Sequence, residues 1–356
     1  MKIVIKVGTQ SILSTEGVPF GSLMLHLVEE LVSLKREGHQ LVLVSSGAVA
    51  SGRKAASQFG RQYGSSIGEK QVLASLGQHE LMHLYATMFK THKMLVSQLL
   101  LTKQDFQTRQ HYLNISRLLH EILNDENIIP IINENDSVAI EELMFTDNDE
   151  LAGLIASQLN ADKLIILSNV EGVYSGHPNE PDSKFIPLID PKHHGWPEVS
   201  TIKNLHGRGG MVSKLGTARK MSNLGITTHI ADIKHSHVLT RIISGEALGT
   251  TILPSQRKSN LKRWIAYSSD QNAGSIYINA RLFEIIKENK RVISILPIGI
   301  EKCAGNFKRG DLVEILTLDN QKIGLGIAKY DAVKLNEFLG QKDKPELIHY
   351  DHLHIF

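Results

Sequence analysis

Two clusters of polar side chains lie on either side of one connection in the middle of the chain. Asn133-Glu134-Asn135-Asp136 follows directly on the apolar run of residues 128–132, and fourteen residues after Asn133 comes Asp147-Asn148-Asp149. In open α/β sheets, ligands bind at the carboxyl ends of the strands. Turn chemistry combined with a helix cap is the alternative explanation for either cluster alone. Together the clusters predict a site for a small polar molecule.

The second cluster also reads as a helix start. Thr146 and Asp149 have the spacing of a capping pair, and the apolar residues Leu151, Leu154, Ile155 and Leu159 continue with helical periodicity. We therefore expect Thr146 to cap a helix that begins near Asp147.

A lysine interrupts the first expected strand, residues 2–7. Lys6 stands among β-branched residues and is followed by Gly8-Thr9. A lysine in a buried strand is unfavourable unless its charge has a partner. It can instead lie at an edge, with its stem packed and its ammonium group in solvent. The neighbouring glycine favours a lysine directed at phosphate, with backbone N–H groups close by.

Two further loops could bind an anion. Ser45-Ser46-Gly47-Ala48 joins an expected strand to a small-residue helix start, which leaves backbone N–H groups unpaired. Residues 207–214, GRGGMVSK, place glycines, a hydroxyl and Lys214 before another expected helix. This loop resembles a P-loop in chemistry but lacks its spacing, and a solvated turn is the alternative.

The order of elements predicts a parallel sheet between two layers of helices. The expected strands are residues 2–7, 40–45, 94–101, 128–132, 163–167 and 226–231. The expected helices are residues 22–37, 71–92, 103–125 and 214–224, the third with its apolar side at Leu113, Leu118, Leu119 and Ile122. Residues 53–68 are polar and contain glycine, so a mobile loop is expected there.

The pattern changes near the C-terminus. Residues 254–263 are polar and basic and are expected to link a domain of residues 1–253 to one of residues 264–356. Short strands are expected at residues 264–267, 275–278, 312–316 and 323–328, which indicates a small β-rich module. Its core is expected to contain Trp264, Ile276, Ile278, Val313, Ile315 and Ile327.

Composition excludes several classes of protein. The net charge of +2 does not indicate binding to nucleic acid or membrane, and Cys303 is the single cysteine, so no internal disulfide can form. The first residues are expected to form a strand rather than a signal peptide, and no apolar run is long enough to span a bilayer. His193-His194 has no third ligand at zinc-like spacing. We expect a cytoplasmic protein.

Residues 1–253 resemble the amino-acid kinase family. The motifs that carry the resemblance are Lys6-Val7-Gly8-Thr9, SSGAVASGR from residue 45, PIINEND from residue 130, FTDNDEL from residue 145, and GRGGMVSK. Residues 296–310, LPIGIEKCAGNFKRG, resemble a PUA domain. The family's three-layer α/β fold with a mostly parallel central sheet is therefore expected, followed by a β-rich PUA-like domain. Within the family, the motifs resemble specifically those of the members that phosphorylate glutamate, at the first step of proline synthesis.

The resemblance also implies roles for individual residues. Lys6 and Lys214 would contact the transferring phosphoryl group from opposite sides, and Asp149, with Asp147 beside it, would order both lysines. The residues implied to hold glutamate are Ser46, Asp136 and Asn148. Those implied to bind ATP are Lys6, Gly8, Gly47, Ser168, Asn169, Arg208, Gly209, Gly210, Met211, Val212, Ser213 and Lys214. Mg²⁺ would arrive with ATP rather than on a ligand set of the protein. Proline is implied as a feedback inhibitor, and a homo-oligomer as the assembly.

Two positions depart from the family pattern on the nucleotide side. The family commonly has Thr-Asp where this chain has Ser168-Asn169, and Thr where it has Arg208. Both departures bear on contacts to the base or ribose, not on the chemistry. Ser213 for the usual Thr keeps the hydroxyl.

Three alternatives stay open at this stage. The first is another kinase of the same fold, such as an acetylglutamate or UMP kinase. The second is an RNA-binding or RNA-modifying protein, but residues 263–356 carry 13 Lys and Arg against 12 Asp and Glu, a net charge of only +1. The third is a non-catalytic regulator, which the presence of Lys6, Asp149 and Lys214 argues against.

Overall fold

The computed structural model describes residues 1–13, 21–106, 109–139, 145, 147–176, 180, 182–197, 210–255, 274–287 and 293–355. The chain divides into two compact units, one of Met1–Asp105 with Asn114–Arg257 and one of Lys258–Phe356 with Phe106–Leu113. Among the described residues, no helix combines the length and apolar character that crossing a bilayer requires.

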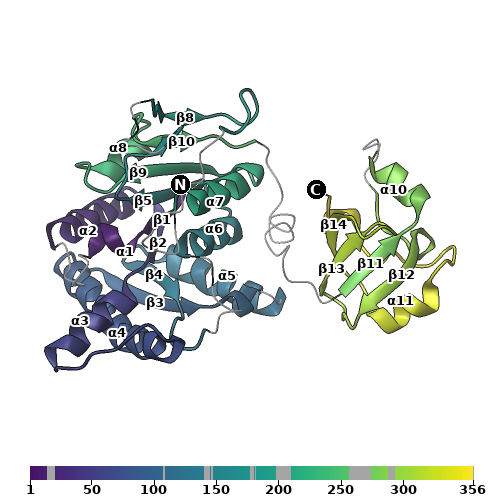
Figure 1. The fold of residues 1–356 in the computed structure, drawn as a ribbon, viewed down its shortest axis with the longest axis horizontal. Coiled ribbons are helices and arrows are strands. Elements are labelled where there is room, and N and C mark those ends of the chain that lie inside the picture. The colour runs from purple at the N-terminus through teal and green to yellow at the C-terminus, as the bar shows by residue number, and fades with distance from the viewer. Residues whose placement is uncertain are drawn as a thin grey trace. The chain divides into compact units, whose positions relative to one another are not determined.

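The larger part of the fold contains ten described strands and nine described helical segments before residue 257 (Figure 1). The strands are β1 (Lys2–Val7), β2 (Gln40–Ser45), β3 (Leu95–Leu101), β4 (Ile128–Glu134), β5 (Lys163–Ser168), β6 (Val173–Tyr174), β7 (Phe185–Ile186), β8 (Leu188–Ile189), β9 (Thr227–Asp232) and β10 (Thr250–Ile252). The helices are α1 (Thr9–Ile12), α2 (Gly21–Arg36), α3 (Ala48–Gln58), α4 (Ile67–Thr91), the 3₁₀ segment η1 (Lys103–Phe106), α5 (Arg109–Asn124), α6 (Asn148–Leu159), α7 (Met211–Asn223) and α8 (Val238–Ile243).

Eight of these strands form one sheet in the order β3-β4-β2-β1-β5-β9-β10-β8. The first six run parallel, and β10 pairs antiparallel with β9. Consequently β4, β2, β1 and β5, which are neighbours in the sheet, all end at the same edge. The predicted parallel sheet between helix layers is confirmed.

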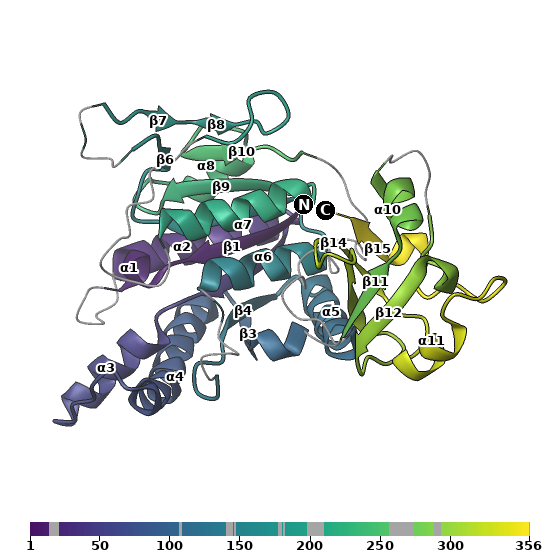
Figure 2. The same ribbon diagram turned by 45° about the vertical axis from the view of Figure 1, so that its right-hand side comes forward.

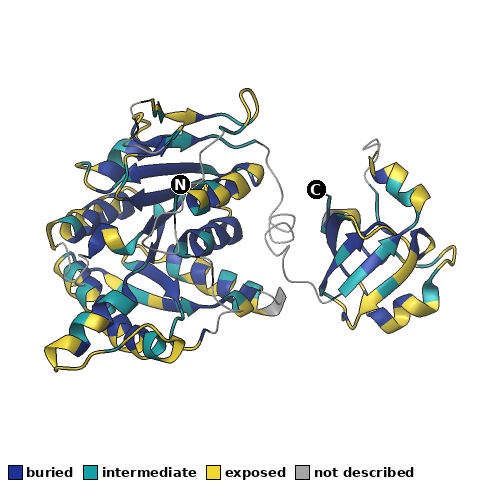
Figure 3. Cartoon of the chain, in the orientation of Figure 1, coloured by how far each residue is buried: buried dark blue, intermediate teal, exposed yellow. Residues whose placement is uncertain are grey.

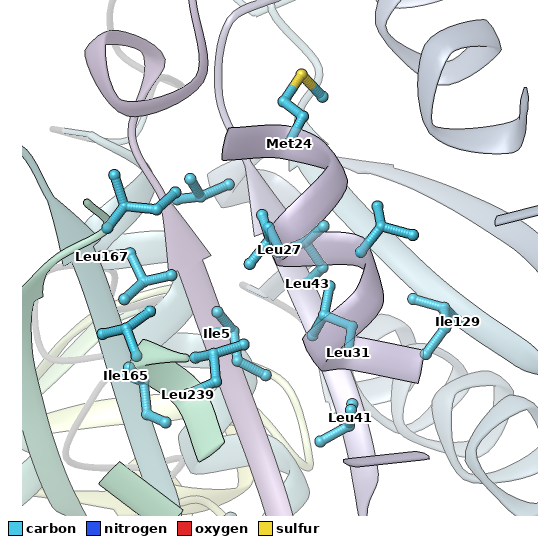
Figure 4. Close-up of a cluster of buried hydrophobic side chains, with 14 of the residues drawn as sticks. Ile5, Met24, Leu27, Leu31, Leu41, Leu43, Ile129, Ile165, Leu167 and Leu239 are labelled. Atoms are coloured by element: carbon cyan, nitrogen blue, oxygen red, sulfur yellow. The ribbon is translucent and has the colours of Figure 1, made fainter. Parts of the chain in front are cut away.

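Side-chain alternation along β1 separates a hydrophobic layer from the layer that carries the charges. Ile3, Ile5 and Val7 pack into a buried cluster with residues of α2, α4 and α8. Figure 4 shows Leu27 and Leu31 of α2 beside Ile5 in this cluster. Because successive side chains of a strand point to opposite faces, Lys6 faces the other layer. That layer contains α6 and α7, as Figure 2 shows.

The C-terminal unit is a separate β-rich fold with its own core. Its strands form a sheet in the order β12-β11-β13-β14-β15, and buried residues line that sheet (Figure 3). The elements are β11 (Gly274–Ile278), α10 (Ala280–Lys287), η3 (Pro297–Gly299), β12 (Ile300–Gly305), β13 (Leu312–Leu316), β14 (Lys322–Ile327), α11 (Ala332–Phe338), η4 (Tyr350–His352) and β15 (Leu353–Ile355). The predicted core residues Ile276, Ile278, Val313, Ile315 and Ile327 are all buried, whereas Trp264 and residues 256–263 of the proposed linker lie outside the described residues.

Three local predictions were wrong. The mobile loop expected over residues 53–68 is partly helix α3, and the helix expected over residues 103–125 divides into η1 and α5. On α5, Leu113 and Leu118 are about half exposed, while Ile115, Leu119 and Leu123 are buried. Leu119 is buried as predicted, but Leu113 and Leu118 were wrongly assigned to the apolar side, because leucines can also lie on the solvent side of a helix.

Helices α3 and α4 cross so closely that only glycine fits at the contact. A Cβ atom on Gly77 would lie 1.8 Å from the carbonyl oxygen of Ala48, and one on Gly52 would lie 1.9 Å from that of Leu73. Both obstructing atoms belong to the backbone, so one helix would have to shift. The crossing thus fixes the start of α3, next to Ser46 and Gly47.

We predict that Gly77→Ala lowers the free energy of unfolding by about 1–3 kcal/mol, because overpacking displaces backbone. The matched control is Gly68→Ala on the same helix, where an added Cβ meets nothing within 4 Å. Alanine should there be neutral or stabilising by up to about 1 kcal/mol. Urea unfolding of both variants checks this, and equal stability of the two would contradict the close crossing.

Candidate active site

The functional side chains converge on a cleft of about 660 Å³ at the carboxyl edge of the large sheet. Strands β1, β2, β4 and β5 each deliver residues to it from the point where the strand ends. Predicted residues that line the cleft are Lys6, Gly8, Ser46, Gly47, Asp136, Asn148, Ser168, Asn169 and Lys214. Chain segments far apart in sequence are therefore brought together by the parallel sheet.

An ion triad forms one wall of the cleft. Lys6 Nζ lies 2.7 Å from Asp149 Oδ1, and Lys214 Nζ lies 2.8 Å from Asp149 Oδ2. Asp149 is fully buried, and Lys6 and Lys214 are only 5% and 7% exposed. The partner that a lysine in the first strand required is therefore Asp149, which holds both lysines from behind while they line the cleft.

The charges of the triad are set by burial and by one another. Burial raises the pKa of Asp149, but the two lysines together outweigh burial, so the pKa of Asp149 is lowered from its ordinary value. The pKa of Lys6 is lowered, first by burial and then by the neighbouring charge of Lys214, although Asp149 opposes this change. An anionic ligand placed beside Lys6 would favour its charged form.

Asp147, not Thr146, caps helix α6. Asp147 accepts hydrogen bonds from the backbone N–H groups of Asp149 at 2.9 Å and Glu150 at 3.1 Å. Thr146 lies outside the described residues. The correction has a physical basis. The side chain of an aspartate at the N-cap accepts from backbone N–H groups two and three residues later, as that of a threonine does.

Amide side chains form a hydrogen-bonded network, and three of its residues, Ser46, Asn133 and Asn148, line the same cleft as the two lysines. Asn148 Nδ2 donates to Ser46 Oγ at 2.8 Å and to Asn133 Oδ1 at 2.9 Å. Asn133 in turn donates to Gln78 Oε1 at 2.8 Å. Glu134 accepts a 2.7 Å hydrogen bond from the backbone N–H of Phe145. This bond ties the first polar cluster to the residue that stands two positions before the second cluster. The amide side chains of the network are uncharged, whereas Glu134 and Asp136, which also line the cleft, carry carboxyl groups.

The glycine at the start of α3 is required by its conformation. Gly47 has φ of +112°, and a Cβ atom there would lie 2.8 Å from Leu13 Cδ1. Gly47 precedes α3, so N–H groups of that first turn lack helical partners and are available to an anion.

Only some of the residues predicted to bind the nucleotide are described by the structure and line the cleft. Asn169 Nδ2 donates to Gln10 Oε1 at 3.3 Å, which joins the end of β5 to α1. Gly210 precedes α7, and Met211, Val212, Ser213 and Lys214 form its first turn. Of these four, only Lys214 lines the cleft, and Val212 is more than half exposed. Arg208 and Gly209 lie outside the described residues.

Several cleft residues were given no role from sequence. Gln10, Arg53, Lys70 and Phe145 line the cleft, and Gln78 joins its amide network from behind. The helix that carries Gln78 was predicted from sequence over residues 71–92, but no role was assigned to any residue on it. A glutamine on the apolar face of that helix is the signal that could have found it.

Comparisons with known proteins agree with this geometry. The model of the amino acid kinase family matches residues 1–232, and the model of the PUA domain matches residues 274–345. The chain is 41% identical to the glutamate 5-kinase of Chlorobaculum tepidum, over 99% of this chain and 97% of that protein. It is 37% identical to the glutamate 5-kinase of Bacteroides thetaiotaomicron, over 99% of this chain and 98% of that protein.

A solved structure shows the same fold at low sequence identity. An isopentenyl phosphate kinase from T. acidophilum superimposes with a TM-score of 0.50 and 17% identity, over 71% of this chain and 100% of that chain. The chain is an α/β protein with a cleft, lined in part by Lys6 and Lys214, at the carboxyl edge of its sheet. It belongs to the amino acid kinase family and carries a C-terminal PUA domain. The resemblance drawn from its motifs is confirmed.

The ionised carboxylate of Asp147 lowers the stability of the folded chain. Burial, followed by the charge of Asp149, raises the pKa of Asp147 above its ordinary value. Its ionised form therefore destabilises the folded chain at any pH above both the unfolded and the folded pKa. That destabilisation disappears as the pH falls through the folded pKa towards the unfolded one.

We predict that Asp147→Asn, which removes the charge but keeps an oxygen for the helix cap, raises the melting temperature at pH 7 by roughly 2 °C. The gain should shrink as the pH approaches 4. Calorimetry at both pH values measures it. Asp147→Ala is the control, because it loses the cap as well and should not gain stability. A lower melting temperature for Asp147→Asn at pH 7 would contradict the assigned direction.

Proposed function

We propose that this chain is a glutamate 5-kinase, which transfers the γ-phosphoryl group of ATP to the γ-carboxylate of L-glutamate. The product would be L-glutamyl 5-phosphate, in the first step of proline biosynthesis. The observation that carries the proposal is the buried Lys6–Asp149–Lys214 triad, whose two lysines line the same cleft as the amide network around Asn148. It is supported by curated relatives of that activity, which align with nearly the whole chain.

Phosphoryl transfer to a carboxylate needs positioning and charge neutralisation rather than a base. The γ-carboxylate of glutamate has a pKa of about 4.3 and is already an anion at neutral pH. Two anions must then approach one another, and negative charge is spread over the phosphoryl oxygens in the transition state. Lys6 and Lys214 would stabilise that charge from two sides, with Asp149 fixing both ammonium groups.

The residues that line the cleft suit the two substrates. Ser46, Asp136 and Asn148 would hold glutamate. Backbone N–H groups at Gly8 and Gly47 would face phosphate oxygens, and Ser168, Asn169 and the segment from Gly210 to Lys214 would border the nucleotide. Arg208 and Gly209 are proposed for the same border on the motif alone.

Mg²⁺ is best regarded as part of the nucleotide substrate. Both oxygens of Asp149 are taken by lysines, and ionisation of Asp147 is disfavoured by its surroundings. These carboxylates therefore suit the positioning of lysines better than the ligation of a resident metal. The ion would be held by the phosphates of ATP.

Further properties follow from the same assignment. Proline is proposed as a feedback inhibitor, the assembly as a homo-oligomer, and the location as cytoplasmic, which a single free cysteine suits. We propose a kinase domain of residues 1–253, a linker of residues 254–263 and a PUA-like domain of residues 264–356. RNA is not proposed as a ligand, because residues 263–356 carry a net charge of only +1.

The direct test incubates the chain with ATP, Mg²⁺, glutamate and hydroxylamine, which traps an acyl phosphate as the hydroxamate. We predict hydroxamate with glutamate and no phosphorylated product with acetylglutamate, carbamate or UMP as acceptor. Omission of ATP is the control. Comparable turnover of acetylglutamate would refute the assignment.

Substitutions in the triad and in the residues proposed to hold glutamate should change different kinetic constants. We predict that Lys214→Ala lowers kcat by at least about a hundredfold with less effect on the KM for glutamate, because its charge acts mainly in the transition state. Asp136→Ala should chiefly raise the KM for glutamate. Steady-state kinetics of both variants provide the test, and an intact kcat in Lys214→Ala would remove the role assigned to that lysine.

Nucleotide selectivity should depend on Asn169. An asparagine offers a donor and an acceptor, whereas an ionised aspartate only accepts, so a ligand group that needs a carboxylate loses a charge-assisted hydrogen bond. We predict that Asn169→Asp raises the ratio of kcat/KM for ATP over GTP. An unchanged ratio would mean that position 169 does not contact the nucleotide.

A further inference from the structure

One backbone hydrogen bond fixes the orientation of the amide network described above. The backbone N–H of Glu134 donates to Asn133 Oδ1 at 2.9 Å. A peptide N–H can only donate, so this atom of Asn133 must be oxygen. Asn133 Nδ2 is consequently the donor to Gln78, and the atom of Gln78 that faces it must be the acceptor Oε1, 2.8 Å away.

The same oxygen of Asn133 orients Asn148. Asn133 Oδ1 also faces an atom of Asn148 at 2.9 Å, which must therefore be the donor Nδ2. The carbonyl oxygen of Ser45, another acceptor, lies 3.4 Å from the same Nδ2. Both donors of Asn148 are thus directed at the protein. A reversed amide would place oxygen against oxygen.

What remains to Asn148 is one acceptor. Asn148 lines the cleft, and its Oδ1 is buried without a hydrogen-bond partner among the described residues. An unsatisfied buried oxygen calls for a donor, and a ligand bound in the cleft could supply it. Within glutamate at neutral pH, the α-ammonium group donates and both carboxylates only accept. The oxygen therefore matches the ammonium group.

We propose that Gln78 is a positioning residue for the amino-acid substrate. Through Asn133 it holds Asn148 with Oδ1 towards the α-ammonium group. Gln78 lies on α4, is 7% exposed and does not itself line the cleft, so it acts only through its neighbours. The inference rests on the proposed function and deepens it, since the network makes the site selective for an amino acid over the corresponding dicarboxylic acid without an amine.

The test compares glutamate with glutarate, which lacks the α-ammonium group. Three variants are required. Gln78→Met has similar volume and no acceptor, Gln78→Glu keeps an acceptor oxygen, and His79→Met places the same side chain at the exposed next position of the helix. Measurements are kcat, the KM for glutamate and for MgATP, and the inhibition constant of glutarate against glutamate. Thermal unfolding checks that each variant folds, and Gln78→Ala replaces Gln78→Met if the latter does not.

In Gln78→Met the KM for glutamate should rise by about tenfold or more, as expected for losing a hydrogen bond to a charged group. The inhibition constant of glutarate, kcat and the KM for MgATP should stay within about threefold of their values in the unaltered chain. Gln78→Glu should largely restore the preference for glutamate, and His79→Met should match the unaltered chain.

Two outcomes would overturn the inference alone. In one, the unaltered chain phosphorylates glutamate but Gln78→Met keeps the same preference for glutamate over glutarate. In the other, binding of both acids weakens equally, which indicates general loss of packing. An unaltered chain that does not phosphorylate glutamate at all would instead overturn the proposed function, and the inference with it.

Discussion

The site depends on one buried carboxylate shared by two buried lysines. Burial opposes all three charges, and Asp149 stays ionised because Lys6 and Lys214 both contact it. One carboxylate cannot neutralise two ammonium groups, so the pair retains a need for a further anion. That unmet need is the physical reason why a phosphoryl group fits between them. The arrangement requires β1, α6 and the start of α7 to meet within a few ångströms, which constrains the rest of the domain.

The parallel sheet meets that constraint and supplies the second half of the site. Alternation along β1 sends Ile3, Ile5 and Val7 into the hydrophobic layer and leaves Lys6 for the layer of α6. The neighbouring ends of β2 and β4 carry the amide network, which is polar but brings little charge. The triad thus brings positive charge to the cleft, and the amide network brings directional hydrogen bonds. With these two kinds of group in one cleft, the protein could bind two different anions, each through its own contacts.

Local patterns in the sequence predicted those parts that local chemistry determines. The strands that end at the site, the small β-rich unit and the need of Lys6 for a partner all followed from periodicity and from the unfavourable burial of charge. Contacts between distant segments did not follow. Nothing near Gln78 indicates that its partner is Asn133, and nothing near residue 53 indicates that a close glycine crossing with α4 supports helix α3 there. The helix cap was misassigned because Thr146 and Asp147 are both competent caps, and only the fold selects between them.

The central claim is that Asp149 acts by fixing the two lysines on the transferring phosphoryl group. The most direct measurement is the rate of a single turnover of ATP and glutamate in Asp149→Asn, with the affinity for MgATP measured separately on the same variant. The account predicts a transfer rate lower by at least about a hundredfold, with nucleotide affinity changed much less, because the lysines lose their orientation chiefly where transition-state charge is stabilised. An unchanged transfer rate in a folded Asp149→Asn variant would contradict the account.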